Sequence, residues 1–175
     1  MSTFSFYSSK DQKVTAASTW DSLFQDPSVD LLPAESKTPG SVWWLDVQDA
    51  SQQDVNAVAQ ALSIHPLTVE DVVMRESREK VEVFRNYYFI SFHTVLSPKL
   101  SPDTERAKQA EFYILVFSNG TVTFSPSGCN HVQRVRDRVR RLHDPAILSS
   151  DWLCYAIMYV SKTPVLLHSI LTRQR

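Results

Sequence analysis

Polar and apolar positions along the chain switch between a period of two and a period of three to four, which predicts strands interleaved with helices. One helix is predicted over residues 52–62, after an N-cap region at residues 49–51, because its apolar residues recur at helical spacing. These residues are Val55, Val58, Ala59 and Leu62. Apolar, aromatic and β-branched runs predict strands at residues 4–8, 41–47, 86–96 and 111–117.

The second half of the chain completes the fold prediction. Asn119-Gly120 lies between two apolar runs and is a strong hairpin signal. Two more helices are predicted near residues 129–142 and 150–160, and Pro164 is expected to end the second of them. Strands separated by helices, with one antiparallel hairpin, favour an α+β (α/β-like) fold. We expect a three-layer αβα sandwich, a mixed sheet with helices on both faces.

The segment from Ser63 to Phe84 carries the densest local signals. Pro66 suits the first turn of a helix, so a helix is predicted to begin there. Glu70 and Asp71 follow in its first turns and point about 100° apart, so the two acids can serve different neighbours. From Lys80 onward polar and apolar residues alternate, which predicts a half-buried strand.

Length and composition fit one globular domain over residues 1–175, with residues 1–41 partly irregular apart from a helical turn near 20–24, and a polar loop at 97–108. The formal net charge of -1 and pI near 6.5 argue against binding to nucleic acid or to anionic membranes, both of which require a basic surface. Cys129 and Cys154 have no neighbouring cysteine, so neither a metal-ligand spacing nor a disulfide framework is present, and a reducing compartment is favoured.

No run of apolar residues approaches the length of about 18 that a membrane span requires, and the N-terminus lacks the pattern of a signal peptide. We therefore expect a soluble chain that contains no transmembrane region and makes no membrane contact itself.

Several motifs occur in a fixed order along the chain. Residues 64–84 contain IHPL, then ED, then KVE and Phe84, followed by an aromatic strand. Trp44 and Asp46 form a W-x-D strand, residues 122–124 a V-T-F strand, and residues 132–142 a helix with a V-R-x-R-V-R pattern. On these motifs and the opening of the next helix at residues 149–156, the chain resembles the cytoplasmic N-terminal domain of CorA-family magnesium channels over about residues 4–157. The aromatic and serine-rich opening at residues 4–9 is most similar to the fungal Alr-type branch.

This resemblance implies a function and a site. The chain would be the regulatory and assembly domain of a CorA-like transporter, at the cytoplasmic face of a plasma or vacuolar membrane. It would form a ring with other copies of the same subunit in the full-length protein, and a monomer or weak dimer alone. Asp71, the second acid of the ED pair, would lie at the interface between subunits and take part, with Glu70, in a regulatory Mg²⁺ site. With few carboxylates and a water-retaining ion, weak binding is expected.

One region departs from the family pattern. After Tyr155-Ala156-Ile157 the family continues with aspartates that add to metal binding, whereas this chain continues with Met158, Tyr159 and Val160. The acids of a second metal site are therefore missing.

Each functional residue has an alternative interpretation. Acids in a first helical turn can simply favour the positive end of the helix dipole. His65 is interpreted as a hydrogen-bonded structural residue rather than a catalytic one. The arginines between residues 134 and 141 are interpreted as the solvated face of an amphipathic helix, because valines recur through the segment at helical spacing. No organised nucleophile or base accompanies the acid pair, so no enzyme activity is expected. The alternative function is that of a soluble αβα protein, an enzyme or a partner-binding module, that shares only the fold.

Overall fold

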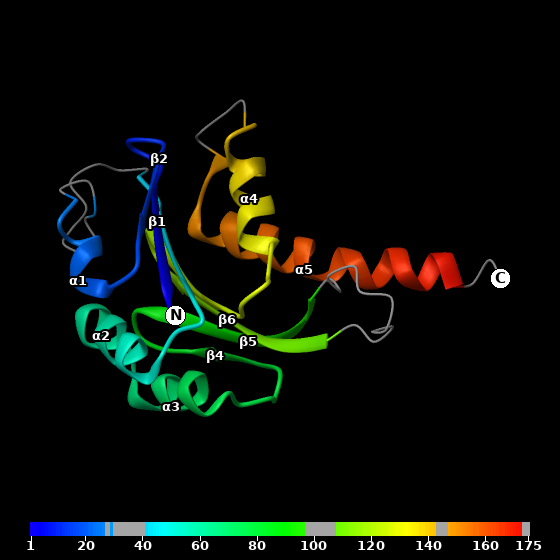
Figure 1. The fold of residues 1–175 in the computed structure, drawn as a ribbon, viewed down its shortest axis with the longest axis horizontal. Coiled ribbons are helices and arrows are strands. Elements are labelled where there is room, and N and C mark those ends of the chain that lie inside the picture. The colour runs from blue at the N-terminus through cyan, green and yellow to red at the C-terminus, as the bar shows by residue number, and fades with distance from the viewer. Residues whose placement is uncertain (27–28, 30–40, 97–107, 143–146, 173–175) are drawn as a thin grey trace.

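A computed structural model describes residues 1–26, 29, 41–96, 108–142 and 147–172 of the chain, without the side chains of residues 108 and 162–172. These residues form a seven-stranded sheet with helices against it (Figure 1). The strands are β1 (Thr3–Ser8), β2 (Lys13–Ala17), β3 (Trp43–Gln48), β4 (Lys80–Val83), β5 (Tyr87–Leu96), β6 (Lys108–Phe117) and β7 (Gly120–Ser125). The polar loop predicted at residues 97–108 falls, apart from its last residue, outside the described residues, as does part of the irregular stretch predicted before residue 41.

The sheet is mixed, as the sequence predicts. Its strand order is β2-β1-β3-β7-β6-β5-β4, and β3 and β7 pair in parallel while the other neighbouring strands pair antiparallel. Trp43 of β3 lies opposite Gly120 of β7. The two strands are far apart in sequence, so the sheet joins the N-terminal and C-terminal halves of the chain at its centre.

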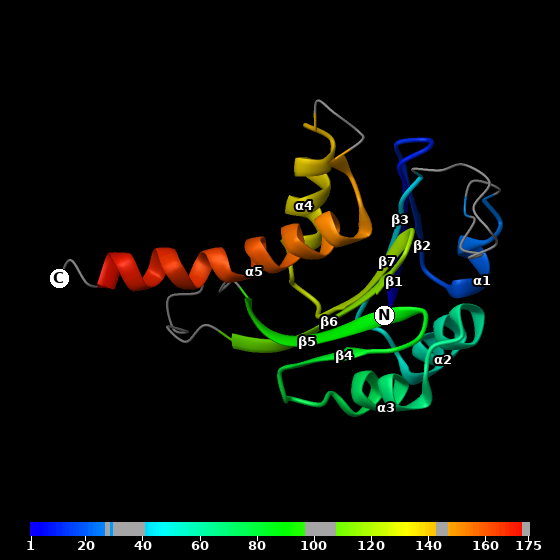
Figure 2. The same ribbon diagram turned by 180° about the vertical axis from the view of Figure 1, so that it is seen from behind.

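Helices cover both faces of the sheet, which confirms the predicted fold class. The helices α1 (Trp20–Leu23), α2 (Gln52–Leu62) and α3 (Pro66–Met74) lie on one face, and α4 (His131–Val139) and α5 (Ser150–Thr172) on the other (Figures 1 and 2). Each face has its own core. Phe4, Leu45 and Phe89 belong to the first, and Trp44, Phe112 and Ile157 to the second.

The caps of α2 and α3 explain where these helices begin. Ser51 and Asp54 form a reciprocal capping box at the start of α2. At α3, Pro66 occupies the first turn and the His65 Nδ1 atom accepts a hydrogen bond from the Leu67 backbone N–H. The predicted helix start at Pro66 is therefore confirmed, and His65 has a capping role.

Gly120 belongs to the predicted hairpin between β6 and β7, and this position has no room for a side chain. Its φ is not in the left-handed region. A Cβ atom at this position would lie 1.9 Å from the Trp43 ring on the neighbouring strand. The hairpin is confirmed, and the glycine lets an indole pack flat on the backbone of β7.

Two elements differ from the sequence prediction. The strand β2 was not predicted, because it is only five residues long, two of them alanines, and none is buried. The helix α5 continues through Pro164, where the sequence predicts an end. A proline inside a helix removes one backbone hydrogen bond. The helix tolerates this loss because its preceding turns, which include the buried Leu153 and Ile157, are tightly packed.

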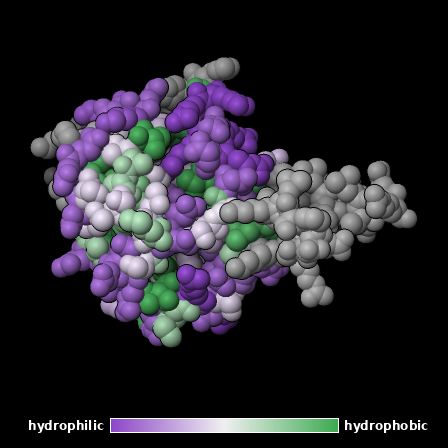
Figure 3. Space-filling model, in the orientation of Figure 1, coloured by the Kyte–Doolittle hydropathy of each residue, from purple (hydrophilic) through white to green (hydrophobic). Residues whose placement is uncertain are grey.

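The surface of the domain is largely hydrophilic on the face of Figure 3, where apolar residues form small separate spots. Among the described helices, none is both long enough and apolar enough to cross a membrane.

Candidate functional site

The adjacent acids Glu70 and Asp71 of α3 point in different directions, as their helical spacing predicts. Glu70 is exposed on the outer face of the helix, between Leu67 and Met74, which are 56% and 74% exposed. Asp71 is half-buried and faces β4, the strand at the edge of the sheet. The carboxylate of Glu70 therefore lies at the surface, and that of Asp71 lies beside the edge strand of the sheet.

Asp71 already has a cation beside it. The Asp71 Oδ2 atom lies 2.7 Å from Lys80 Nζ, which also lies 3.1 Å from Glu82 Oε1. The Asp71 carboxylate raises the pKa of Lys80, so the ammonium is charged at neutral pH. A metal ion that binds Asp71 must share the carboxylate with Lys80 or displace the ammonium.

The strand β4 is half-buried, but its polar side is the inner one. Lys80 and Glu82 face α3, whereas Val81 and Val83 are 66% and 84% exposed. Alternation alone cannot say which side is buried. Here the Lys80 ammonium forms an ion pair with Asp71 and lies 5.9 Å from the centre of the Phe89 ring. Both contacts favour burial of the charged side of β4 and exposure of its valines.

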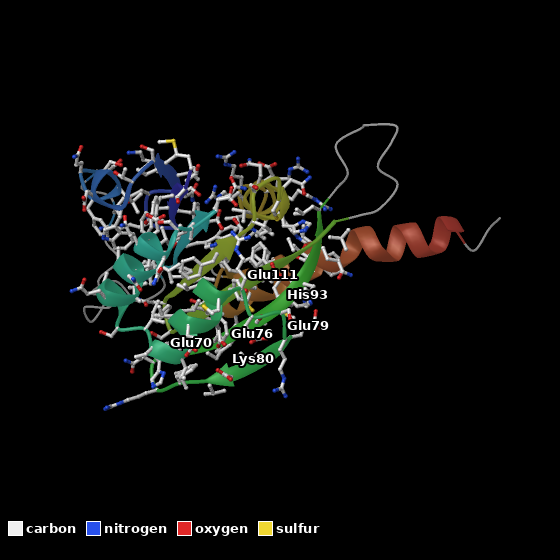
Figure 4. All side chains as sticks on the ribbon, turned by 60° about the horizontal axis from the view of Figure 1, so that its bottom comes forward. Glu70, Glu76, Glu79, Lys80, His93 and Glu111 are labelled. Atoms are coloured by element: carbon white, nitrogen blue, oxygen red, sulfur yellow. The ribbon has the colours of Figure 1, made fainter. Side chains whose placement is uncertain are left out.

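More acids surround this site. Figure 4 shows Glu70, Glu76, Glu79 and Glu111 together with Lys80 and His93, contributed by α3, its connection to β4, and the strands β4 to β6. The backbone N–H of His93 donates to Glu79 Oε1 at 3.0 Å, and Glu111 lies opposite His93 across the β5–β6 pair. The concentration of carboxylates favours the approach of cations.

The donor set fits a hard cation only loosely. Carboxylate oxygens are the ligands that Mg²⁺ prefers, and Mg²⁺ keeps several of its waters. Within the described ranges, however, no group of three or more His, Cys, Asp or Glu side chains is placed to hold a metal ion. One copy of the chain thus offers one or two carboxylates, which suits a hydrated ion shared with a second molecule.

His65 takes part in a structural contact beside this site. Its backbone N–H donates to the Tyr87 hydroxyl at 3.0 Å, and that hydroxyl also shares a 2.8 Å hydrogen bond with Thr68 Oγ1. The imidazole lies 5.2 Å from the Phe84 ring, which stacks on Tyr87. These contacts fix α3 to the β4–β5 hairpin and agree with the structural interpretation of His65.

The matched region of a protein-family model covers the site and most of the sheet. The family described as "CorA-like Mg2+ transporter protein" matches residues 39–161. This chain belongs to that family. Its motifs also place it near the fungal Alr-type branch, and the relatives confirm this resemblance.

Named relatives of this CorA-like chain are transporters rather than enzymes. The putative metal ion transporter C27B12.12c of Schizosaccharomyces pombe is 40% identical over 89% of this chain and 19% of that protein. The magnesium transporter ALR2 of Saccharomyces cerevisiae is 38% identical over 90% of this chain and 18% of that protein. The chain thus spans about a fifth of the length of these relatives.

Similarity to a solved structure supports the fold. The cytoplasmic domain of ZntB from Vibrio parahaemolyticus superposes with a TM-score of 0.61 at 13% identity, covering 97% of this chain and 62% of that chain.

The CorA motifs meet in a buried polar network that the sequence did not predict. Arg136, from the V-R-x-R helix, is buried and donates to the Ser5 hydroxyl at 2.5 Å and to the Ser5 carbonyl at 3.3 Å. Its guanidinium lies 5.2 Å from the centre of the Trp44 ring. The interpretation of the arginines as a solvated face is therefore wrong for Arg136, which anchors α4 to β1. The valines Val132, Val135 and Val139 are buried as expected.

Asp46, the acid of the W-x-D motif, lies in the same network. It accepts hydrogen bonds from Thr123 at 2.6 Å and Ser125 at 3.3 Å. Burial raises the pKa of Asp46, and the hydrogen bond from Thr123 and the charge of Arg136 offset part of this effect. The presence of both Asp46 and Arg136 in the motifs was the available signal that they lie in one buried network.

His131 completes the polar layer beneath α4. Its Nε2 atom lies 2.5 Å from Thr94 Oγ1, and burial lowers the pKa of His131 to about 4, with the charge of Arg134 adding to the effect. The imidazole is therefore neutral at physiological pH. Because these groups are enclosed, they hold α4 on the sheet, whereas the carboxylates of the α3–β4 site remain closer to water.

Proposed function

We propose that this chain is the regulatory and assembly domain of a CorA-like divalent metal ion transporter, and that it senses Mg²⁺ through Glu70 and Asp71 at contacts between copies. The domain would lie at the cytoplasmic face of a plasma or vacuolar membrane and form a ring with like subunits in the full-length protein. Membership of the family and the names of the transporter relatives support the transport role.

One observation carries the sensing proposal: Glu70 is an exposed carboxylate set between two exposed apolar side chains, Leu67 and Met74. Apolar residues at the surface favour contact with another protein surface. A carboxylate in the middle of such a contact would be desolvated without compensation unless a cation accompanies it. A hydrated Mg²⁺ ion shared with the second copy supplies that charge while keeping its waters.

Lys80 sets the concentration range of this sensor. At low Mg²⁺ the ammonium neutralises Asp71, so the carboxylate is held inside one copy. At higher Mg²⁺ the divalent ion competes for the same carboxylate, and Lys80 retains Glu82 as a partner. This exchange predicts weak, millimolar binding and a shift of population between free and associated domains.

Sedimentation velocity with Mg²⁺ or with a chelator tests the proposal on this chain. We expect mostly monomer or weak dimer in chelator at micromolar concentration, larger species with millimolar Mg²⁺, and loss of the Mg²⁺ effect in Glu70→Gln and Asp71→Asn. Asp11→Asn, an exposed acid in the turn before β2, is the matched control. K⁺ at equal ionic strength controls for screening. A pentamer that is stable in chelator, or submicromolar Mg²⁺ binding that survives Asp71→Asn, would contradict the proposal.

A further inference from the structure

The outer edge of β4 combines features that an edge strand normally avoids. In the part of the chain that the structure describes, β4 has β5 on one side and no strand on the other (Figure 4). Its outward-facing side chains are Val81 and Val83, on the α5 face of the sheet. Proteins usually blunt an edge with charged side chains, proline or a bulge, because unpaired backbone groups recruit other strands. Here both charged side chains of β4 point to the α3 face instead.

The backbone groups of the same two valines point away from the sheet. The Phe84 N–H donates to the Tyr87 carbonyl at 2.8 Å, so Phe84 and Tyr87 form a hydrogen-bonded pair. In an antiparallel ladder such pairs alternate, which makes residues 82 and 80 the next ones bonded to β5. The N–H and C=O groups of Val81 and Val83 are therefore left at the free edge, beside their own exposed apolar side chains.

We propose that the edge of β4 pairs with β4 of a second copy, antiparallel about a two-fold axis at Val81. Paired residues of adjacent strands must lie on the same face, so only registers that join residues of equal parity are possible. Among these registers, the one centred on Val81 places Lys80 opposite Glu82 of the second copy, twice. The register centred on Glu82 places two glutamates opposite each other, and one centred on Lys80 opposes two lysines. Opposite charges across strands stabilise the pair and like charges destabilise it.

Lys80 can make this contact without leaving its own partners. Its ammonium has three donors, of which Asp71 and Glu82 of the same copy use two. The third is available for the second copy. On the other face, Val81 meets Val81 and buries apolar surface that is now exposed. The contact involves one short strand per copy, so it is small and describes a weak dimer.

This contact and the Mg²⁺-dependent contact proposed for α3 share Lys80, but they are formed by different elements, the edge of β4 here and the outer face of α3 there. The β4 contact has Lys80 beside its carboxylates and needs no metal ion, so it should form in chelator. Failure of either proposal therefore leaves the other standing.

Disulfide cross-linking tests the register directly. In a hydrogen-bonded antiparallel pair the Cα atoms lie about 5.5 Å apart, within disulfide range. Val81→Cys should therefore cross-link to itself, whereas Val83→Cys would place its two Cα atoms about 14 Å apart along the strands. Burial raises the pKa of Cys129 and Cys154 to about 11, so the native thiols react slowly at neutral pH, and wild type gives their background.

We expect Val81→Cys to form covalent dimer at least tenfold faster than Val83→Cys, in chelator as well as in Mg²⁺. Val81→Lys should abolish the weak dimer in sedimentation, whereas Met74→Lys on α3 should leave it intact. Circular dichroism identifies any variant that fails to fold, and Val81→Thr then replaces Val81→Lys. The proposal would be overturned by equal cross-linking at both positions, by faster reaction at Val83→Cys, or by no dimer above the wild-type background. The last result is also the one expected if this edge binds a different protein.

Discussion

Two clusters of acids and cations lie on opposite faces of one sheet and differ in their access to water. Asp46 and Arg136 are buried between α4 and the sheet, where Asp46 bonds to Thr123 and Arg136 to Ser5. Asp71 and Lys80 lie at the edge of the sheet, with side chains 14% and 23% exposed. The same charge types therefore stand in two environments: the enclosed cluster fixes one arrangement, and the edge cluster leaves its carboxylate and its ammonium within reach of water.

The energetic reason is desolvation. Charges taken fully out of water are costly unless each stays paired, so removing one partner of an enclosed cluster has a large effect. A pair near the surface gains little net free energy, because water replaces the lost partner. This difference predicts how variants of the two clusters separate in stability and in ion binding.

The largest effect is expected for Arg136→Met. The variant loses the hydrogen bonds to Ser5 and leaves Asp46 buried with less positive charge nearby, so the free energy of unfolding should fall by about 3–5 kcal/mol. Urea unfolding measures this loss. Arg134→Met, at an exposed position of the same helix, is the matched control and should stay within about 0.5 kcal/mol of wild type. Equal losses in both variants would show that the helix, not the enclosed charge, is responsible.

The next effect is a pH dependence from His131. Burial lowers its pKa from 6.5 to about 4, so the folded protein binds fewer protons than the unfolded chain between these values. The contribution of His131 to the free energy of unfolding is fully present above pH 6.5. It is lost as the pH falls toward 4 and amounts to about 3 kcal/mol. The raised pKa of Asp46 acts in the opposite sense, since its protonation relieves a buried charge.

Urea unfolding of wild type and His131→Gln between pH 7 and pH 4 isolates the contribution of His131. We expect a flatter profile in the variant, while His93→Gln, a half-exposed histidine on β5, keeps the wild-type slope. A variant profile as steep as that of wild type would remove His131 as the cause.

The smallest stability effect is expected for Lys80→Met. This ion pair is partly buried but still reaches water, so its loss should cost less than the loss of the enclosed Arg136 and the variant should remain folded. Because the competing ammonium is gone, its affinity for Mg²⁺ should rise severalfold in calorimetry. Lys13→Met, which removes a surface ion pair with Asp26, is the control and should leave the affinity unchanged. Weaker Mg²⁺ binding in Lys80→Met would mean that Lys80 supports the site instead of competing for it.

Much of the fold follows from local patterns. Helix starts at Ser51 and Pro66, the β6–β7 hairpin and the mixed sheet could be predicted because capping residues, proline geometry and turn residues act over a few positions. The strand β2 could not, because its pairing with β1 and not its own composition makes it a strand.

The candidate site was predictable only in part. The directions of Glu70 and Asp71 follow from helical spacing, and the arrangement matches. The pairing of Asp71 with Lys80 depends on how the chain returns from α3 to place β4 beside it. The burial of Arg136 depends on its contact with Ser5 of β1, which is far away in the sequence. No local sequence pattern connects the members of either pair. The family motifs contain these residues but do not indicate which of them are in contact in the folded domain.

The parallel pairing of β3 with β7 has a consequence for synthesis on the ribosome. Trp44 Nε1 donates to Thr123 Oγ1, a partner 79 positions later in the sequence. At a translation rate of ~5–20 residues per second, roughly 4–16 s pass between the appearance of the two residues. During that interval β1 can already pair with β3, and β2 with β1, but the other side of β3 still lacks its partner strand β7. The nascent chain therefore exposes an apolar strand whose protection depends on the speed of elongation or on a chaperone, and a pause before residue 120 would lengthen that exposure.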